Sequence, residues 1–383
     1  MRILIAPDKF KGTLTAEAAT NAIARGWRRK RRGDELECLP ISDGGDGFGS
    51  LLGRRLEAEA RQLDTTDAAG RPVTGTWWWV ARDRLAILET ANVIGLALLP
   101  PGRFHPFELD TFGLGGMLRA AAAARPKRCV VGIGGSATND AGFGLARALG
   151  WRFEDARGDT IPRWPELTSL ARVRPPVRPP RFQELVVAVD VRNRLLGARG
   201  ASRIYGPQKG LRPEDMAPAE RAFQRLVRGW KTTMGKATSP ASEPGAGAAG
   251  GLGFGLAAFC GARIESGFEI FARHTELAER IAAADLVITG EGALDLTSVA
   301  MGKGVGRVAA LCRRADVPCV GLAGIVAADA RVRRAFTRIL ALTPDLTSTA
   351  EAMRDAGRWL ARLAEGLASE WPANKRGQVR SKG

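Results

Sequence analysis

The segment 129–140 constrains the fold more than any other part of this sequence, because it reads as a strand, a glycine-rich turn and the start of a helix. The apolar, β-branched run 129–133 suits a strand that is buried on both faces. After the turn, apolar residues recur at helical spacing through Phe143, Ala146 and Leu149. The chain is therefore expected to contain an α/β layer with a parallel strand at this point.

The same turn predicts a binding site for phosphate. Glycine lets backbone N–H groups approach an anion, and the positive end of the following helix favours negative charge. Asn139 is predicted to cap that helix, and two hydroxyl groups add further donors. The residues expected to hold the phosphates are Gly134, Gly135, Ser136, Thr138 and Asn139. A tight strand-to-helix turn without a ligand is the alternative.

Length and composition indicate a soluble protein of two domains. The chain has 383 residues, 45% of them hydrophobic and 25% charged. It shows no apolar leader segment and no 18-residue apolar span, so a cytoplasmic protein, monomer or homodimer, without a membrane partner is expected. Only two histidines occur, and the five cysteines lack paired spacing. Acid–base chemistry is therefore expected from carboxylates and lysines, and zinc or disulfides are not expected.

The formal charge of +17 raises the possibility of a nucleic-acid partner or an anionic substrate. Ten of the 57 basic residues are lysine, and the arginines are scattered along the whole chain. Scattered arginine without an aromatic-studded basic face favours a coding bias toward arginine. A nucleic-acid-binding protein is kept only as a remote alternative.

Two β-loop-α units at the start of the chain carry charged residues after their strands. The first strand leads into a loop with Asp8 and Lys11, and the second leads into a glycine-rich loop with Asp43 and Asp46. Open α/β sheets bind ligands at the carboxyl ends of their strands. Unpaired buried carboxylates are costly, so the two acids suit a magnesium site or a contact with a substrate hydroxyl. A solvated turn is the alternative.

The pattern along the chain predicts one domain inserted into another. Alternating βα patterns occupy both ends of the chain, whereas the middle begins with an aromatic β-hairpin over residues 70–92. We therefore expect a doubly wound parallel sheet formed by residues 1–68 and 284–383, with a second α/β domain formed by residues 69–283.

Familiar nucleotide motifs are mostly missing. The sequence contains no P-loop and no protein-kinase signature. Gly132, Gly134 and Ala137 match the GxGxxA form of the dinucleotide pattern, with Asp155 about twenty residues further on. The residues around Asp155 do not resemble a second parallel strand, so a nicotinamide dehydrogenase is also a remote alternative.

Six motifs in order resemble those of the type 1 glycerate kinases. They extend from about residue 2 to about residue 325, and they read APDKFKG (6–12), SDGGDG (42–47), GIGGSATND (132–140), YGPQKG (205–210), PGAGAAGGLG (244–253) and ITGEG (288–292). The resemblance implies a flavodoxin-like domain with a second α/β domain inserted. It also implies magnesium-dependent transfer of the γ-phosphoryl group of ATP to D-glycerate, giving 2-phosphoglycerate. Phosphorylation of the 3-hydroxyl, or of a related small hydroxy acid, is the alternative.

The resemblance also implies roles for individual residues. Phosphoryl transfer needs hydrogen-bond donors and cations around the phosphates and a carboxylate near the attacking hydroxyl. The expected catalytic residues are Asp8, Lys11, Asp190 and Lys209. Glu291 joins the turn as a nucleotide-binding residue, and Asp43 and Asp295 are the expected metal ligands. Which carboxylate acts as base and which binds metal does not follow from the sequence.

The chain departs from the family pattern at two places. Asp46 stands where a glutamate is usual, and Ala293 stands where the family pattern GEGRxD has arginine. Between Asp295 and Lys303 the usual glutamine is missing and one residue is inserted. Because charge-assisted hydrogen bonds are the strong ones, the loss of arginine predicts a raised KM for glycerate or a shifted preference among hydroxy acids.

Overall fold

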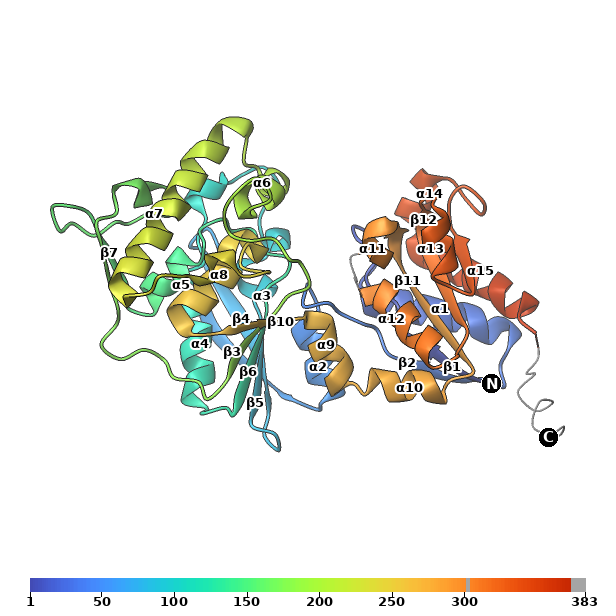
Figure 1. Cartoon of the computed structure of the whole chain (residues 1–383). Helices are drawn as coiled ribbons and strands as arrows, with labels where there is room; N and C mark the ends of the chain where they lie inside the picture. Colours follow the sequence, from blue (N-terminus) through green and yellow to red (C-terminus); the bar gives the residue numbers. More distant parts are fainter. Residues whose placement is uncertain (301–303, 373–383) are drawn as a thin grey trace. The chain divides into compact units, whose positions relative to one another are not determined.

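Two large sheets organise the chain in the computed structural model, which describes residues 1–300 and 304–372 (Figure 1). Each sheet belongs to its own compact unit. The terminal unit contains Met1–Asp43 and the described residues from Phe271 onward, and the inserted unit contains Gly44–Ile270. An α/β domain inserted into another is the architecture that the sequence predicts.

The sheet of the terminal unit is entirely parallel. Its strands, in spatial order, are β2 (Glu35–Cys38), β1 (Arg2–Ile5), β11 (Leu286–Leu294), β12 (Cys319–Val326) and β13 (Arg338–Ala341). Renumbered within the unit, this order is 2-1-3-4-5, the order of the flavodoxin-like fold. The expected flavodoxin-like, doubly wound sheet is therefore confirmed.

The first helix shows why the terminal unit folds as its sequence predicts. Helix α1 (Ala16–Lys30) begins after Thr15, whose Oγ1 accepts a hydrogen bond of 3.1 Å from the N–H of Ala18. Its apolar residues Ile23 and Trp27 are fully buried in a core shared with the sheet and α15 (Ala356–Glu370). The remaining helices of this unit are α10 (Leu277–Ala283), α11 (Leu296–Ala300), α12 (Gly304–Arg314), α13 (Ala330–Arg334) and α14 (Thr349–Arg354).

The inserted unit has a mixed sheet of six strands. In spatial order they are β10 (Arg263–Glu265), β9 (Leu185–Ala188), β6 (Arg128–Gly132), β5 (Leu85–Glu89), β4 (Pro72–Val80) and β3 (Glu59–Thr66). The first four are parallel, and β4 pairs antiparallel with both of its neighbours. The predicted hairpin is confirmed as β4 and β5, and the predicted strand of the central segment is confirmed as β6.

Helices and one small ribbon complete the inserted unit. The ribbon pairs β7 (Arg152–Glu154) with β8 (Arg172–Arg174). The helices are α2 (Phe48–Arg55), α3 (Ala91–Ile94), α4 (Leu114–Ala123), α5 (Phe143–Ala148), α6 (Ala201–Tyr205), α7 (Met216–Met234) and α8 (Ala248–Cys260), and α9 (Gly267–His274) crosses the division between the units. A large apolar core joins the sheet to α4, α5, α7 and α8.

The divisions between the units lie at Asp43/Gly44 and Ile270/Phe271, whereas the sequence pattern predicts them at residues 68/69 and 283/284. Strand β3 pairs with β4 along its whole length, which assigns residues 59–66 to the inserted sheet. Helix α2 packs on β4 and β5. Sequence patterns do not reveal this because β3 is polar and largely exposed, as an edge strand is.

Candidate active site

In the terminal unit, three acidic residues meet at the carboxyl ends of neighbouring strands. Asp8 follows β1, Glu291 lies near the end of β11, and Asp43 follows β2. The N–H of Asp8 donates a hydrogen bond of 2.8 Å to the carbonyl of Gly290, which fixes the loop after β1 beside β11. The boundary between β1 and β11 is the point where the strand order reverses. Doubly wound sheets bind their ligands at this point.

These carboxylates interact electrostatically. Burial, together with the nearby charges of Asp43 and Glu291, raises the pKa of Asp8 to about 8, while the hydrogen bond from the N–H of Lys9 acts in the opposite direction. A carboxyl group that is costly to ionise at a strand end is typical of functional sites. Lys11 is exposed, and its backbone lies beside Gly292 of β11. The structure thus brings Asp8, Asp43 and Glu291 together, with Lys11 in the adjoining loop.

Asp295 has a local structural role. Its Oδ1 accepts hydrogen bonds of 2.7 Å and 3.0 Å from the N–H groups of Thr297 and Ser298, and one of 2.6 Å from the Thr297 hydroxyl. These bonds cap the start of α11. Ala293 is exposed on β11 and pairs with Ile325 of β12. Of the altered loop 291–303, residues 301–303 lie outside the described residues.

In the inserted unit, the predicted phosphate turn follows β6, between the ends of β5 and β9. The N–H of Gly134 donates a hydrogen bond of 3.0 Å to the carbonyl of Gly44, so the acidic loop 44–47 lies directly on the turn. A Cβ at Gly135 would stand 1.6 Å from Oδ1 of Asp46, and Gly135 has a φ of +77°. Only glycine fits here without displacing the Asp46 carboxylate.

The hydroxyl groups of the turn bond to each other. The Oγ of Ser136 lies 2.9 Å from the Oγ1 of Thr138 and also accepts a hydrogen bond of 3.1 Å from the Thr138 N–H. Both side chains are buried. Donors predicted for a phosphate are thus partly engaged within the turn itself.

The prediction that Asn139 caps the next helix is wrong. Helix α5 begins at Phe143, and its N-cap is Gly142 in a left-handed conformation with no side-chain cap. Asn139 is instead fully buried, and its Nδ2 donates a hydrogen bond of 3.0 Å to the Ser202 hydroxyl. Within the described part of the chain, its Oδ1 has no hydrogen-bond partner.

Lys209 is held below the turn. It lies in a short 3-10 helix (Pro207–Lys209) with 8% of its surface exposed, and its Nζ donates a hydrogen bond of 2.6 Å to the carbonyl of Thr138. Burial lowers the pKa of Lys209 to about 7, although the nearby Asp140 carboxylate acts in the opposite direction. Lys209 therefore supports the turn from within the unit.

Asp140 is a buried residue that accepts several hydrogen bonds, and its role was not predicted from the sequence. Its Oδ2 accepts hydrogen bonds from the N–H and hydroxyl of Thr111 and from the N–H of Gly144, and its Oδ1 accepts from the N–H of Gly142. Burial raises the pKa of Asp140, while these donors lower it. Asp140 could have been identified from the sequence because it is the last residue of the GIGGSATND motif.

Asp190, one of the expected catalytic residues, accepts two hydrogen bonds within the inserted unit. Its Oδ1 accepts a hydrogen bond of 2.6 Å from the Ser266 hydroxyl, and its Oδ2 accepts one of 2.7 Å from the N–H of Phe268. The carboxylate therefore holds the start of α9. The base or metal role expected of Asp190 stays a prediction.

Three consecutive residues in left-handed conformations pack against the segment 138–141 that follows the glycine-rich turn. Ala249, Gly250 and Gly251 have φ values of 55°, 68° and 90° inside α8. A Cβ at Gly250 would stand 2.0 Å from the Thr138 carbonyl oxygen, and the Gly250 carbonyl accepts a hydrogen bond from the N–H of Ala141. This small-residue segment therefore packs closely against the backbone 138–141.

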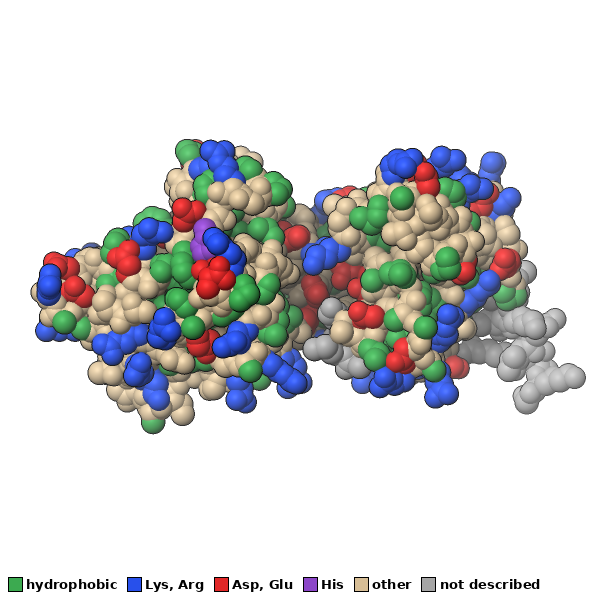
Figure 2. Space-filling view, turned by 90° about the horizontal axis from the view of Figure 1, so that it is seen from above, with side chains coloured by type: hydrophobic (Ala, Val, Ile, Leu, Met, Phe, Trp, Pro, Cys, Tyr) green, Lys and Arg blue, Asp and Glu red, His purple; other side chains and the backbone are tan. Residues whose placement is uncertain are grey.

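The remote alternatives gain no support. Asp155 lies in a loop where it accepts hydrogen bonds from the N–H groups of Arg157 and Asp159, and the adjacent β7 pairs antiparallel with β8. The dinucleotide pattern requires a second parallel strand there. Figure 2 shows Lys and Arg side chains spread over the visible face, with Asp and Glu among them. None of the helices in the described residues is long and apolar enough to cross a membrane.

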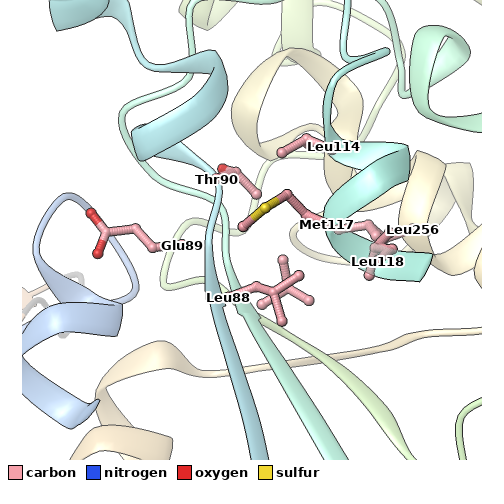
Figure 3. Close-up of a pocket in the computed structure, with 8 residues that line it drawn as sticks. Leu88, Glu89, Thr90, Leu114, Met117, Leu118 and Leu256 are labelled. Carbon is pink, nitrogen blue, oxygen red and sulfur yellow. The ribbon is translucent and has the colours of Figure 1, made fainter. Parts of the chain in front are cut away.

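Glu89, the last residue of β5, is a further candidate that the sequence did not predict. Its carboxylate is largely buried and accepts hydrogen bonds from the N–H groups of Gly47 and Gly49. Figure 3 shows this side chain directed away from Leu88 and Met117, which line a small apolar cavity on the other side of the strand. A single charged residue closing the apolar run LAIL was the available signal.

Comparisons with known proteins agree with the geometry. A profile described as the glycerate kinase family matches residues 3–372. Glycerate kinase of Halalkalibacterium halodurans is 35% identical over 96% of this chain and 98% of its own length, and glycerate 2-kinase of Escherichia coli K12 is 32% identical over 96% and 97%. A crystal structure described as a glycerate kinase 2 from Salmonella typhimurium LT2 superposes with a TM-score of 0.78, at 32% identity, over 96% of this chain and 97% of that one.

Proposed function

Because this chain belongs to the glycerate kinase family, we propose that it transfers the γ-phosphoryl group of ATP to D-glycerate and releases 2-phosphoglycerate. The observation that carries the proposal is the acidic cluster at the strand-order reversal of the terminal unit. Its members Asp8, Asp43 and Glu291 lie in three of the six motifs that resemble the family. A packing role alone would not require a carboxyl group there whose ionisation is so costly.

The acidic cluster fits a magnesium ion. Among residues 1–300 and 304–372, no three Asp, Glu, His or Cys side chains form a ready-made metal cage. Magnesium does not need such a cage, because one or two carboxylates and the phosphates of the substrate usually hold it. Asp43 and Asp8 would hold the ion, which supplies positive charge to the phosphate oxygens. In this proposal Asp295, predicted as a ligand, serves instead as the cap of α11.

The remaining residues bind, orient and neutralise. Lys11, exposed in the loop after β1, supplies positive charge to a phosphate or to the glycerate carboxylate. Glu291 and the turn from Gly134 to Asn139 bind the nucleotide, the turn through backbone N–H groups at Gly135 and Ser136. Lys209 keeps the turn in place through the Thr138 carbonyl. Asp190 contributes indirectly, by fixing the start of α9.

The test is direct. Purified protein with Mg-ATP and D-glycerate should form ADP and phosphoglycerate in equal amounts, and NMR of the product should show phosphate on the 2-hydroxyl. Phosphate on the 3-hydroxyl would correct the product while keeping the activity. Turnover with another short hydroxy acid but not with D-glycerate would correct the substrate, and no turnover with any of them would refute the proposal.

A further inference from the structure

Glu89 caps a helix that begins 41 positions earlier in the chain. Its Oε1 accepts a hydrogen bond of 2.7 Å from the N–H of Gly47, and its Oε2 accepts one of 3.0 Å from the N–H of Gly49. Glu89 stands opposite Gly132, at the point where β6 enters the glycine turn. Figure 3 shows the carboxylate directed toward the segment that enters α2. One side chain therefore joins the end of β5 to the start of α2.

This is a costly way to cap a helix. The first N–H groups of a helix are normally satisfied by a Ser, Thr, Asp or Asn at the N-cap. Here the N-cap is Gly47, with a φ of 88° and no side chain to offer. The cap comes instead from a carboxylate that is 8% exposed, and burial raises its pKa. The two hydrogen bonds and the positive end of the helix offset the cost of burying the carboxylate. The same hydrogen bonds connect the start of α2 to the end of β5.

The hydrogen bonds from Gly47 and Gly49 to Glu89 hold the loop that precedes α2 in place. This loop lies on the glycine turn, where the Gly44 carbonyl accepts from the N–H of Gly134. Asp46, an exposed residue of the loop, has its carboxylate against Gly135, as the 1.6 Å approach of a hypothetical Cβ shows. Because the loop has glycine at 44, 45 and 47, its backbone has little stiffness of its own. The position of the Asp46 carboxylate therefore depends on how the loop is anchored.

We propose that Glu89 is a positioning residue for the kinase reaction, which holds Asp46 beside the glycine turn so that its carboxylate faces the bound substrate. This inference rests on the proposed function, since it assigns the turn to substrate binding. Glu89 itself touches no substrate. It acts through the N–H groups of Gly47 and Gly49, and so through the path of the loop.

A double-mutant cycle tests the inference. Glu89→Gln keeps the shape of the side chain but replaces one acceptor oxygen with an NH2 group that opposes the N–H of Gly47 or Gly49. It should lower kcat at least tenfold, as Asp46→Asn should, and the double variant should be no slower than Asp46→Asn alone. Ser348→Ala is the matched control, because it removes a helix cap from α14 in the terminal unit, where Ser348 accepts from the N–H of Glu351. It should lower the melting temperature without changing kcat.

Each outcome decides the question. The inference would be overturned if Glu89→Gln had the kcat and KM of the wild type. It would also be overturned if the fold-losses in kcat of the two single variants multiplied in the double variant. If the wild type has no kinase activity, the proposed function fails. The role of Glu89 is then tested separately by calorimetric titration, which measures the affinity of each variant for Mg-ADP. Affinity reduced to the same extent by Glu89→Gln, Asp46→Asn and the pair would support positioning, and unchanged affinity in Glu89→Gln would overturn it. If Glu89→Gln does not fold, Glu89→Asp replaces it under the same criteria.

Discussion

Lys209 Nζ donates a hydrogen bond of 2.6 Å to the carbonyl oxygen of Thr138, in the turn that the sequence marks as the phosphate site. The lysine is buried beneath the turn, and burial brings its pKa down to about 7 from 10.5. It therefore loses its charge near neutral pH while the structure stays folded. This relationship makes the stability of the inserted unit depend on pH.

Lys209→Met should remove a rise in stability at alkaline pH. Between about pH 7 and the ordinary lysine pKa of 10.5, the unfolded chain binds a proton at this residue that the folded chain does not. The wild-type free energy of unfolding should therefore rise with pH over this window, by up to about 1.4 kcal/mol per pH unit, and the contribution is lost as pH falls through 7. Urea unfolding of both proteins at several pH values measures the difference. Parallel curves for the two proteins would contradict the burial of Lys209.

Asp8→Asn should stabilise the protein at alkaline pH and abolish its activity. The pKa of Asp8 is raised from 3.8 to about 8, so the folded state binds the extra proton, and its stability falls as pH rises from about 4 to about 8. Asparagine avoids this loss, which is on the order of a few kcal/mol because each pKa unit corresponds to about 1.4 kcal/mol. Thermal unfolding above pH 8 checks the gain.

Magnesium provides the control for Asp8. Above pH 8, added Mg2+ should raise the melting temperature of the wild type more than that of Asp8→Asn. Asp83→Asn, at an exposed position of the inserted unit, should behave as the wild type in both respects. An equal response of Asp8→Asn and wild type to Mg2+ would remove Asp8 from the metal site.

Gly135→Ala should damage both stability and turnover. The new Cβ would meet Oδ1 of Asp46 at 1.6 Å, in addition to the strain of a φ of +77°. Gly158→Ala is the matched control, because Gly158 has a φ of +95° and nothing within 4 Å of its hypothetical Cβ. Gly158→Ala should cost about 1–2 kcal/mol of backbone strain and leave kcat unchanged. Gly135→Ala should cost more and lower kcat/KM at least tenfold in the steady-state assay.

Asp190→Asn should act on stability more than on the chemical step. An asparagine NH2 group cannot accept the hydrogen bond from Phe268 or Ser266, so one of these donors is left unsatisfied, at a cost of about 1–3 kcal/mol. Ser266→Ala should lose part of the same stability, because it removes one donor and leaves the carboxylate in place. Urea unfolding and kcat are measured for both variants. A loss of kcat of a hundredfold or more in Asp190→Asn alone would restore the catalytic role expected from the sequence.

Ala293→Arg should lower the KM for glycerate. Ala293 is an exposed residue of β11 two positions beyond Glu291, so an arginine there has room to extend from the same face of the strand as Glu291. A guanidinium group restores a bidentate partner for a carboxylate or phosphate. Steady-state kinetics with varied glycerate checks this, and Ala293→Lys separates geometry from charge. Unchanged KM in both variants would show that this position does not face the substrate.

The sequence predicts the contents of the site better than the contacts within it. Asp8 and Glu291 could be placed at strand ends because buried β-branched runs and the glycine-rich turns after them are strong local signals. The sequence could not exclude Asn139 as a cap. The helix begins later, at Phe143, because Ala141 and Gly142 adopt left-handed conformations. Such conformations at a non-glycine residue leave little trace in a sequence.

Roles that depend on distant partners were also out of reach. The Asp190 carboxylate is held by Ser266 and Phe268, which lie 76 and 78 positions further on. Glu89 looks like an interruption of an apolar strand until Gly47 and Gly49 are seen beside it. The division of the chain into units was misplaced for the same reason, since β3 is recognised as part of a sheet only through its pairing with β4.

The pairing of β1 with β11 also sets the order in which the chain can fold as it is synthesised. Thr289 donates to the carbonyl of Ala6, 283 positions away, and Ile3 stands opposite Leu286. The first 43 residues therefore leave the ribosome long before their sheet can be completed, whereas the inserted unit has its own sheet and core within a continuous segment. Domains usually finish in the order of translation. In this chain the segment made first is completed last, because its partner strand is synthesised only after the whole inserted unit.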